Sequence, residues 1–134
     1  MRKILLDTNA YSSFLGGDTD VFNLIVSADV VQVSTIVIGE LYFGFYGGNK
    51  FQQNKDRLES FLKKSNVRVI GITLETSEIF GELQNNLKRQ GKPIPVNDVW
   101  IAAQAIENGA KLVTYDAHFE NVSGLRLWNW KNKS

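Results

Sequence analysis

The sequence predicts an α/β protein, a three-layer α/β/α domain with a mostly parallel central sheet. Short runs of aliphatic and β-branched residues alternate along the chain with longer stretches whose apolar residues repeat at helical spacing. The first short run, at residues 4–6, is continuously aliphatic, which is typical of a parallel strand buried on both faces. A chain of 134 residues can bury one core of this kind, so we expect a single domain over residues 1–134.

In the first half of the chain, two strands each lead directly into a helix. Asp7, Thr8 and Asn9 follow the first strand and are typical helix-capping residues, as are Ser34 and Thr35 after the second strand. The expected elements, in order, are a strand at 3–6, a helix that ends at Gly16, a helix at 21–28 after a cap at 18–20, a strand at 30–33, a helix from about 36 to 46, and a helix that starts at Asn49 or Asn54 and ends at 63–64.

The second half continues the alternation of strands and helices. Thr73 is the expected cap of the longest helix, whose late Lys88 and Arg89 suit the negative end of the helix dipole. The expected elements, in order, are a strand at 67–72, a helix from Thr73 to Gly91, a helix at 99–107 capped by Asn97 or Asp98, a strand at 111–114, and a final strand at 125–128 edged by Trp128 and Trp130, with a tail at 131–134 that is expected to fray.

The composition excludes several classes of site. The sequence has no cysteine, which excludes disulfides, zinc fingers, iron–sulfur sites and a thiol nucleophile, and it has a single histidine, His118. The formal net charge of +1 gives no overall sign of a polyanion partner. We expect a cytoplasmic protein without membrane contact, because cysteine and a signal peptide are absent and no apolar run approaches the roughly 18 residues of a membrane span.

The carboxylates of three aspartates are predicted to meet at one edge of the sheet. Asp7 directly follows the first strand, and Asp116 follows the strand that ends at Thr114. Asp98 lies at the start of a helix, and helix N-termini in such a fold open onto the carboxyl edge of the sheet, where ligands bind. Taken singly, each aspartate is better explained as a helix cap or a turn residue, and Thr114 as an ordinary strand threonine.

Glu40 is the most informative acid in the sequence. The expected helix at 36–46 is apolar nearly all round, so we expect it to be largely buried. An ionised glutamate in such a helix requires a cation or strong hydrogen bonds. Four carboxylates, without cysteine and with one histidine, form the ligand set of a hard cation, Mg²⁺ or Mn²⁺, which supports phosphodiester hydrolysis by activated water.

With these four acids in place, the sequence resembles the PIN-domain ribonucleases, specifically the VapC-type toxins of bacterial and archaeal toxin–antitoxin pairs. The resemblance covers nearly the whole chain. It is carried by four blocks in order: ILLDTN at 4–9, GELYFG at 39–44, VNDVWIAA at 96–103 and LVTYDAHF at 112–119. In many members of the family an asparagine occupies the position of Asp116, so this sequence carries the full acidic set.

The resemblance implies an endoribonuclease in which Asp7, Glu40, Asp98 and Asp116 surround Mg²⁺ or Mn²⁺. It implies that Thr114 orients the acidic cluster, with Asn9 as a lesser candidate. It also implies an RNA substrate, a homodimer, and a cognate antitoxin that silences the enzyme. The extra aromatic residues fit a groove or a dimer face, although they fit a core equally well; they are Tyr42, Phe43, Phe45, Tyr46 and Phe51.

Two other functions remain open from the residues. A non-catalytic PIN-like binding module would normally lack one or more of the acids, and all four are present. A receiver-type signalling domain also has an acidic Mg²⁺ pocket, but the expected strand at 67–72 ends without the aspartate that such a domain phosphorylates. The RNA target, the antitoxin, the number of metal ions and the dimer geometry are left undetermined. No role is assigned to His118. The basic residues Lys88, Arg89 and Lys92 are interpreted as a solvated helix end in preference to RNA contacts.

Overall fold

The computed structural model describes residues 1–128, and its centre is a sheet of four parallel strands in the order β3-β2-β1-β4. The strands are β1 (Lys3–Leu6), β2 (Val30–Ser34), β3 (Val67–Ile70) and β4 (Lys111–Val113). The helices are α1 (Thr8–Leu15), α2 (Thr19–Ser27), α3 (Thr35–Tyr46), α4 (Phe51–Leu62), α5 (Leu74–Gln90), α6 (Val96–Asn108) and the 3₁₀ helix η1 (Ala117–Asn121).

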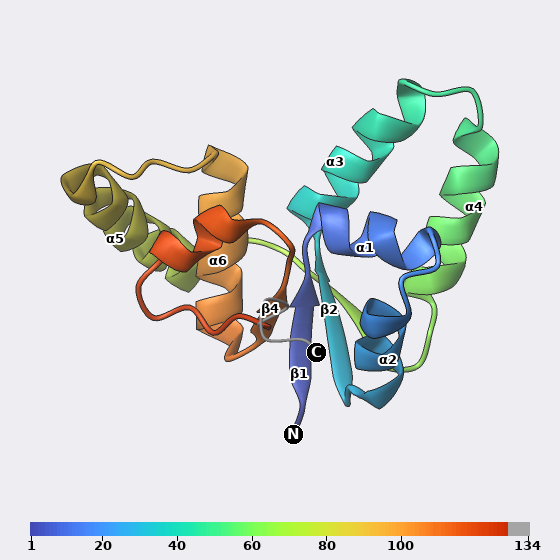
Figure 1. Cartoon of the computed structure of the whole chain (residues 1–134), viewed down its shortest axis with the longest axis horizontal. Helices are drawn as coiled ribbons and strands as arrows, with labels where there is room; N and C mark the ends of the chain where they lie inside the picture. The colour runs from blue at the N-terminus through green and yellow to red at the C-terminus, as the bar shows by residue number, and fades with distance from the viewer. Residues whose placement is uncertain (129–134) are drawn as a thin grey trace.

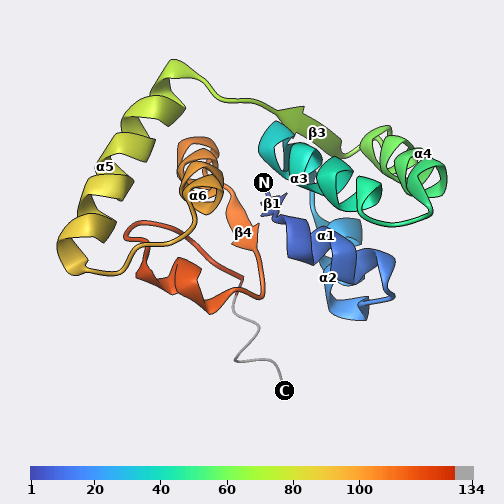
Figure 2. The ribbon, with the colours of Figure 1, turned by 90° about the horizontal axis from the view of Figure 1, so that it is seen from above.

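The helices cover the sheet from two sides, which confirms the predicted three-layer α/β/α fold. Seen from above, α5 and α6 lie together on one side of the sheet, and α1 to α4 lie on the other (Figure 2). The core contains aliphatic residues from every strand, and the β1 side chains of Ile4, Leu5 and Leu6 are buried, as expected for a central parallel strand. No helix within residues 1–128 is long and apolar enough to cross a membrane.

The strand order places the ends of β1 and β4 side by side (Figure 1). β1 pairs with both β2 and β4, and Leu6 lies opposite Val113 in the register of β1 with β4. The Asp7 amide still donates to the carbonyl of Val113 at 3.2 Å, so the contact between the two strands extends as far as Asp7. The crevice where neighbouring strands leave in different directions is the ligand position of open parallel sheets.

The predicted final strand at 125–128 is wrong. That segment makes one isolated parallel bridge, between Leu112 and Leu127, because its backbone hydrogen bonds with β4 are limited to those of Arg126 and Trp128 with Leu112. Trp128 covers this edge, as expected, with its ring 5.5 Å from that of Tyr115. The expected contribution of Trp130 and the expected fraying at 131–134 lie outside the described residues.

Several predicted boundaries and caps are also corrected. Neither Asn49 nor Asn54 caps α4, which follows Lys50 without a side-chain cap. Neither Asn97 nor Asp98 caps α6, because the Pro95 carbonyl already accepts the first helical hydrogen bonds and α6 begins three residues earlier than expected. Two strands stop short of their predicted ends: β3 at Ile70, the last residue that β2 can pair with, and β4 at Val113. The predicted caps Asp7, Asp18, Ser34 and Thr73 do accept hydrogen bonds from the first turns of their helices.

The apolar composition of α3 predicted a helix buried on all sides, and this prediction is wrong. Only Val37, Leu41 and Phe45 are buried, because α3 and α4 extend beyond the sheet as a helical hairpin (Figure 1). The Phe43 and Tyr46 side chains are 83% and 74% exposed. The aromatic set therefore divides between the core and an exposed surface.

Candidate active site

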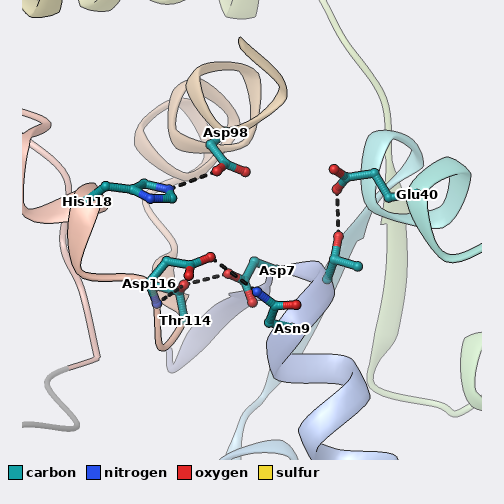
Figure 3. Close-up of polar contacts among 8 residues, drawn as sticks. Asp7, Asn9, Glu40, Asp98, Thr114, Asp116 and His118 are labelled. Carbon is teal, nitrogen blue, oxygen red and sulfur yellow. Dashed lines mark hydrogen bonds and ion pairs between the residues drawn. The ribbon is translucent and has the colours of Figure 1, made fainter. Parts of the chain in front are cut away.

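The four predicted acids line one pocket at the carboxyl edge of the sheet. The pocket has a volume of about 330 Å³ and is formed by the start of α1, by α3, by the start of α6 and by the segment after β4. Figure 3 shows the carboxylates converging from these separate elements. The pocket is lined by Asp7, Thr8, Asn9, Glu40, Pro95, Val96, Asn97, Asp98 and Asp116.

Asp7 lies deepest in this group and is only 3% exposed. One of its oxygens, Oδ1, accepts from the Ala10 amide at 2.8 Å and so caps α1, while Oδ2 accepts from Thr114 Oγ1 at 2.5 Å. Burial raises the pKa of Asp7 to about 6 against these two hydrogen bonds, and the nearby carboxylates of Asp116 and Asp98 raise it further. Asp7 is thus both a helix cap and a pocket residue.

Thr114 and Asp116 form one hydrogen-bonded turn after β4. Thr114 Oγ1 accepts a hydrogen bond from the Asp116 amide at 3.0 Å and donates its own hydrogen bond to Asp7. Asn9 on α1 donates from Nδ2 to Asp116 Oδ2 at 3.3 Å. The threonine hydroxyl therefore joins the ends of β1 and β4, and Asn9 adds a second connection between the same two segments.

Glu40 enters the pocket from α3 and is half-buried. Its Oε1 accepts from Thr8 Oγ1 at 2.6 Å, a contact between two helices that no motif in the sequence predicts. Thr8 lies in the first turn of α1, next to Asp7, so one turn of helix orients two of the four acids.

Asp98 lies in the first turn of α6 and contacts His118, to which no role was assigned. His118 Nε2 lies 2.8 Å from Asp98 Oδ2. Burial raises the pKa of Asp98, and the neighbouring Glu40 and Asp116 carboxylates add to this increase, whereas the His118 contact lowers it. The sequence offered one signal for this contact, since His118 lies two residues after Asp116 in the fourth motif.

The donor set of the pocket fits a hard divalent cation. Its lining residues include four carboxylates and no lysine, arginine or histidine, so the part of the chain that the structure describes supplies no cation inside it. Carboxylate and amide oxygens are the ligands that Mg²⁺ and Mn²⁺ prefer. Burial is the main cause of the raised pKa values of Asp7 and Asp98, and neighbouring carboxylates add to it, so a cation in the pocket would favour the ionised form of both acids.

The basic residues near the end of α5 do not line this pocket. Lys88, Arg89 and Lys92 are exposed, and the first two lie in the last turn of α5, where positive charge stabilises the helix end. Their predicted solvated position is confirmed, and contact with RNA stays a prediction.

Comparison with known proteins identifies the family. Residues 4–125 match the PIN domain. Ribonuclease VapC2 of Rickettsia felis is 31% identical to this chain over 131 residues, which cover 94% of this chain and 96% of that protein. The chain belongs to the PIN-domain family of VapC ribonucleases.

Solved structures agree with this assignment. The crystal structure of VapBC2 from Rickettsia felis, bound to a DNA fragment from its promoter, includes a chain that is 30% identical, with a TM-score of 0.84 over 96% of this chain and 98% of that one. The VapBC-1 structure from nontypeable Haemophilus influenzae includes a chain that is 26% identical, with a TM-score of 0.86 over the same shares. The VapC match argues against the receiver-type alternative.

Proposed function

We propose that this protein is a Mg²⁺-dependent endoribonuclease, with Mn²⁺ as an alternative ion, and the toxin of a toxin–antitoxin pair. The observation that carries the proposal is the pocket in which Asp7, Glu40, Asp98 and Asp116 converge without a lysine or arginine among its lining residues. The chain's place among the VapC ribonucleases supports RNA as the substrate. In this proposal residues 1–134 form a single catalytic domain.

The four acids are the proposed metal ligands. A bound Mg²⁺ or Mn²⁺ supplies charge neutralisation of the phosphate and a water of lowered pKa. Asp7 and Asp116 line the pocket from the ends of β1 and β4, and Glu40 and Asp98 line it from α3 and α6, so these four side chains would hold the ion. The acids thus approach the phosphate position from four separate elements, which fixes their relative geometry through the core.

The remaining polar groups orient these ligands. Thr114 holds Asp7 and the Asp116 backbone, Asn9 holds the Asp116 side chain, and Thr8 holds Glu40. Each of these neutral donors occupies an oxygen of its carboxylate and leaves lone pairs free for a cation. Second contacts of this kind set the direction in which a metal ligand points.

The proposed partners are an RNA substrate, a cognate antitoxin and a second copy of this chain. The VapBC structures from Rickettsia felis and Haemophilus influenzae support the antitoxin. The exposed Phe43 and Tyr46 on α3 support an interface, since aromatic residues are enriched at interface cores and depleted on free surfaces. We place the protein in the cytoplasm, where such a toxin meets RNA.

Cleavage of RNA tests this proposal against a non-catalytic binding module. The purified protein is incubated with total cellular RNA and Mg²⁺ or Mn²⁺, and parallel reactions contain EDTA or the Asp7→Asn variant. We expect discrete products with either metal and none in the two controls. Products that persist in EDTA would contradict metal dependence. If a range of RNA pools gave no products while the protein bound RNA, the binding module would be the correct function.

A further inference from the structure

His118 approaches the acidic pocket from outside. Its Nε2 lies 2.8 Å from Asp98 Oδ2, and because an ionised carboxylate only accepts hydrogen bonds, an ionised Asp98 requires the tautomer in which the imidazole donates from Nε2. His118 is not among the residues that line the pocket. Figure 3 shows the ring on the side of Asp98 that faces away from Glu40. The histidine therefore contacts the back of this carboxylate.

The Asp98 carboxylate depends on this contact for its orientation. Asp98 lies in the first turn of α6 without capping it, because Pro95 occupies the cap position and its carbonyl accepts the first helical bonds. Within residues 1–128, the hydrogen bond that Asp98 accepts through its side chain comes from His118. Without the imidazole, this hydrogen bond would no longer select one of the staggered rotamers of the Asp98 side chain.

The position of His118 is fixed by the 3₁₀ helix η1. Its neighbour Phe119 is fully buried in the core, and the His118 and Phe119 rings lie 4.7 Å apart. Asp116, at the start of η1, lines the pocket. One short segment thus brings an acid into the pocket and places a donor behind the acid of another helix. Ligand atoms of Asp98, Asp116 and His118 lie within 4.8 Å of one another.

We propose that His118 is a positioning residue that holds one oxygen of Asp98 and turns the other toward the cation shared with Asp116. This inference rests on the proposed metal-dependent function. A direct role of the imidazole as a ligand is less consistent with the structure, because His118 lies outside the pocket lining and Mg²⁺ favours oxygen ligands.

Metal binding without RNA provides the first test. Dissociation constants for Mn²⁺ are measured by electron paramagnetic resonance of free Mn²⁺ on the full chain and on His118→Gln, His118→Asn and His118→Leu. The Gln amide nitrogen reaches about as far as Nε2, whereas the Asn amide is one carbon shorter. We expect the Leu and Asn variants to bind Mn²⁺ about tenfold or more weakly, and the Gln variant to stay within about threefold of the original chain.

Comparable melting temperatures of the metal-free variants establish that packing of η1 is retained. Equal weakening in Gln and Leu, or unchanged binding in Leu, would overturn the positioning role. If the Leu variant does not fold, the Gln and Asn pair decides the question, since both keep a polar side chain and differ by one carbon.

The single histidine of the chain provides a spectroscopic test on the unmodified protein. Long-range ¹H–¹⁵N spectra report the two nitrogens of His118 without overlap from another histidine. We expect Nε2 to carry a proton both before and after saturation with Mg²⁺, and the Asp98→Asn variant to change the Nε2 signal. Loss of the Nε2 proton when Mg²⁺ binds would show direct ligation and overturn the proposal.

These outcomes separate the inference from the proposed function. If the original chain binds Mn²⁺ but cleaves no RNA, the nuclease function fails, and the dissociation constants still decide the role of His118. If it binds Mn²⁺ and cleaves RNA but the Leu variant equals it in both, only the role of His118 fails. If the original chain binds no divalent cation, both fail.

Discussion

Thr114 Oγ1 donates a hydrogen bond of 2.5 Å to Asp7 Oδ2, and this contact joins the ends of two adjacent parallel strands. The two residues are 107 positions apart in the chain. Because Thr114 also accepts from the Asp116 amide, one hydroxyl relates two of the four acids to each other. The geometry of the pocket therefore depends on the register of β1 with β4.

Replacing Thr114 by valine is expected to reduce RNA cleavage by about 10- to 100-fold, the usual cost of losing a contact behind a metal ligand. Valine fills the same volume but leaves the Asp7 oxygen and the Asp116 amide without their shared partner. Thr114→Ser, which keeps the hydroxyl, is the control. Initial cleavage rates at saturating Mg²⁺ provide the measurement, and equal rates for the valine and serine variants would refute the orienting role.

The free energy of unfolding of the metal-free protein should depend on pH because of Asp7. Its pKa is about 6 in the folded protein, compared with 3.8 for an unperturbed aspartate, so the folded state binds the proton more tightly. The tighter proton binding stabilises the folded state. This stabilisation is fully present below about pH 4 and is lost as the pH rises through about 6. The whole difference corresponds to about 3 kcal/mol.

The variant Asp7→Asn cannot ionise at this position. Its free energy of unfolding is therefore expected to exceed that of the original chain by about 2 kcal/mol at pH 8 and to differ little from it at pH 4. Urea denaturation in EDTA at both pH values measures the difference. Glu59→Gln, which removes an exposed acid on α4, is the matched control and should show no such increase. A loss of stability at pH 8 would contradict the raised pKa of Asp7.

Divalent cations should offset the loss of stability that accompanies ionisation of Asp7, and the size of this effect should depend on pH. At a Mg²⁺ concentration 100 times its dissociation constant, the stability gain is about 2.7 kcal/mol. Below about pH 6, protons compete for Asp7, so the shift in melting temperature should shrink from pH 8 to pH 5. Calorimetric scans with and without Mg²⁺ measure this shift. An equal shift at both pH values, or an undiminished shift in Asp7→Asn, would place the cation elsewhere.

The exposed aromatic residues of α3 are expected to form part of the proposed dimer face. Phe43→Asp introduces a charge at a side chain that is 83% exposed, so the fold should tolerate it while the interface should not. Sedimentation velocity should show a dimer for the original chain and a monomer for the variant. Phe22→Asp, at an exposed aromatic position on α2, is the control and should remain dimeric. An unchanged mass for Phe43→Asp would remove α3 from the interface.

The parts of the site that follow strands were predictable from the sequence. Asp7 and Asp116 were placed correctly because a continuous aliphatic run marks a buried parallel strand, and parallel strands end at a common edge. Asp98 was brought to the pocket by the same argument, although its helix begins earlier than expected. Pro95 decided that boundary through its backbone carbonyl, whereas the sequence pattern pointed to the side chains that follow it.

Two of the contacts that orient the acids were missed by the reading of the sequence, whereas those of Thr114 and Asn9 agree with the expectation. The hydrogen bonds from Thr8 to Glu40 and from His118 to Asp98 join residues on different elements, and their geometry depends on how those elements pack. The exposure of α3 was missed for a related reason. Apolar composition predicts burial only where a neighbour covers the helix, and this hairpin extends past the sheet.

Anomalous diffraction from crystals grown with Mn²⁺ would locate a cation bound by the four acids. We expect an anomalous peak inside the pocket, bound by oxygens of the acidic set and absent from crystals of Asp7→Asn. His118 should remain bonded to Asp98 and outside the coordination sphere. A peak elsewhere on the protein, or none at a Mn²⁺ concentration that supports RNA cleavage, would contradict the assignment of these four acids to a metal centre.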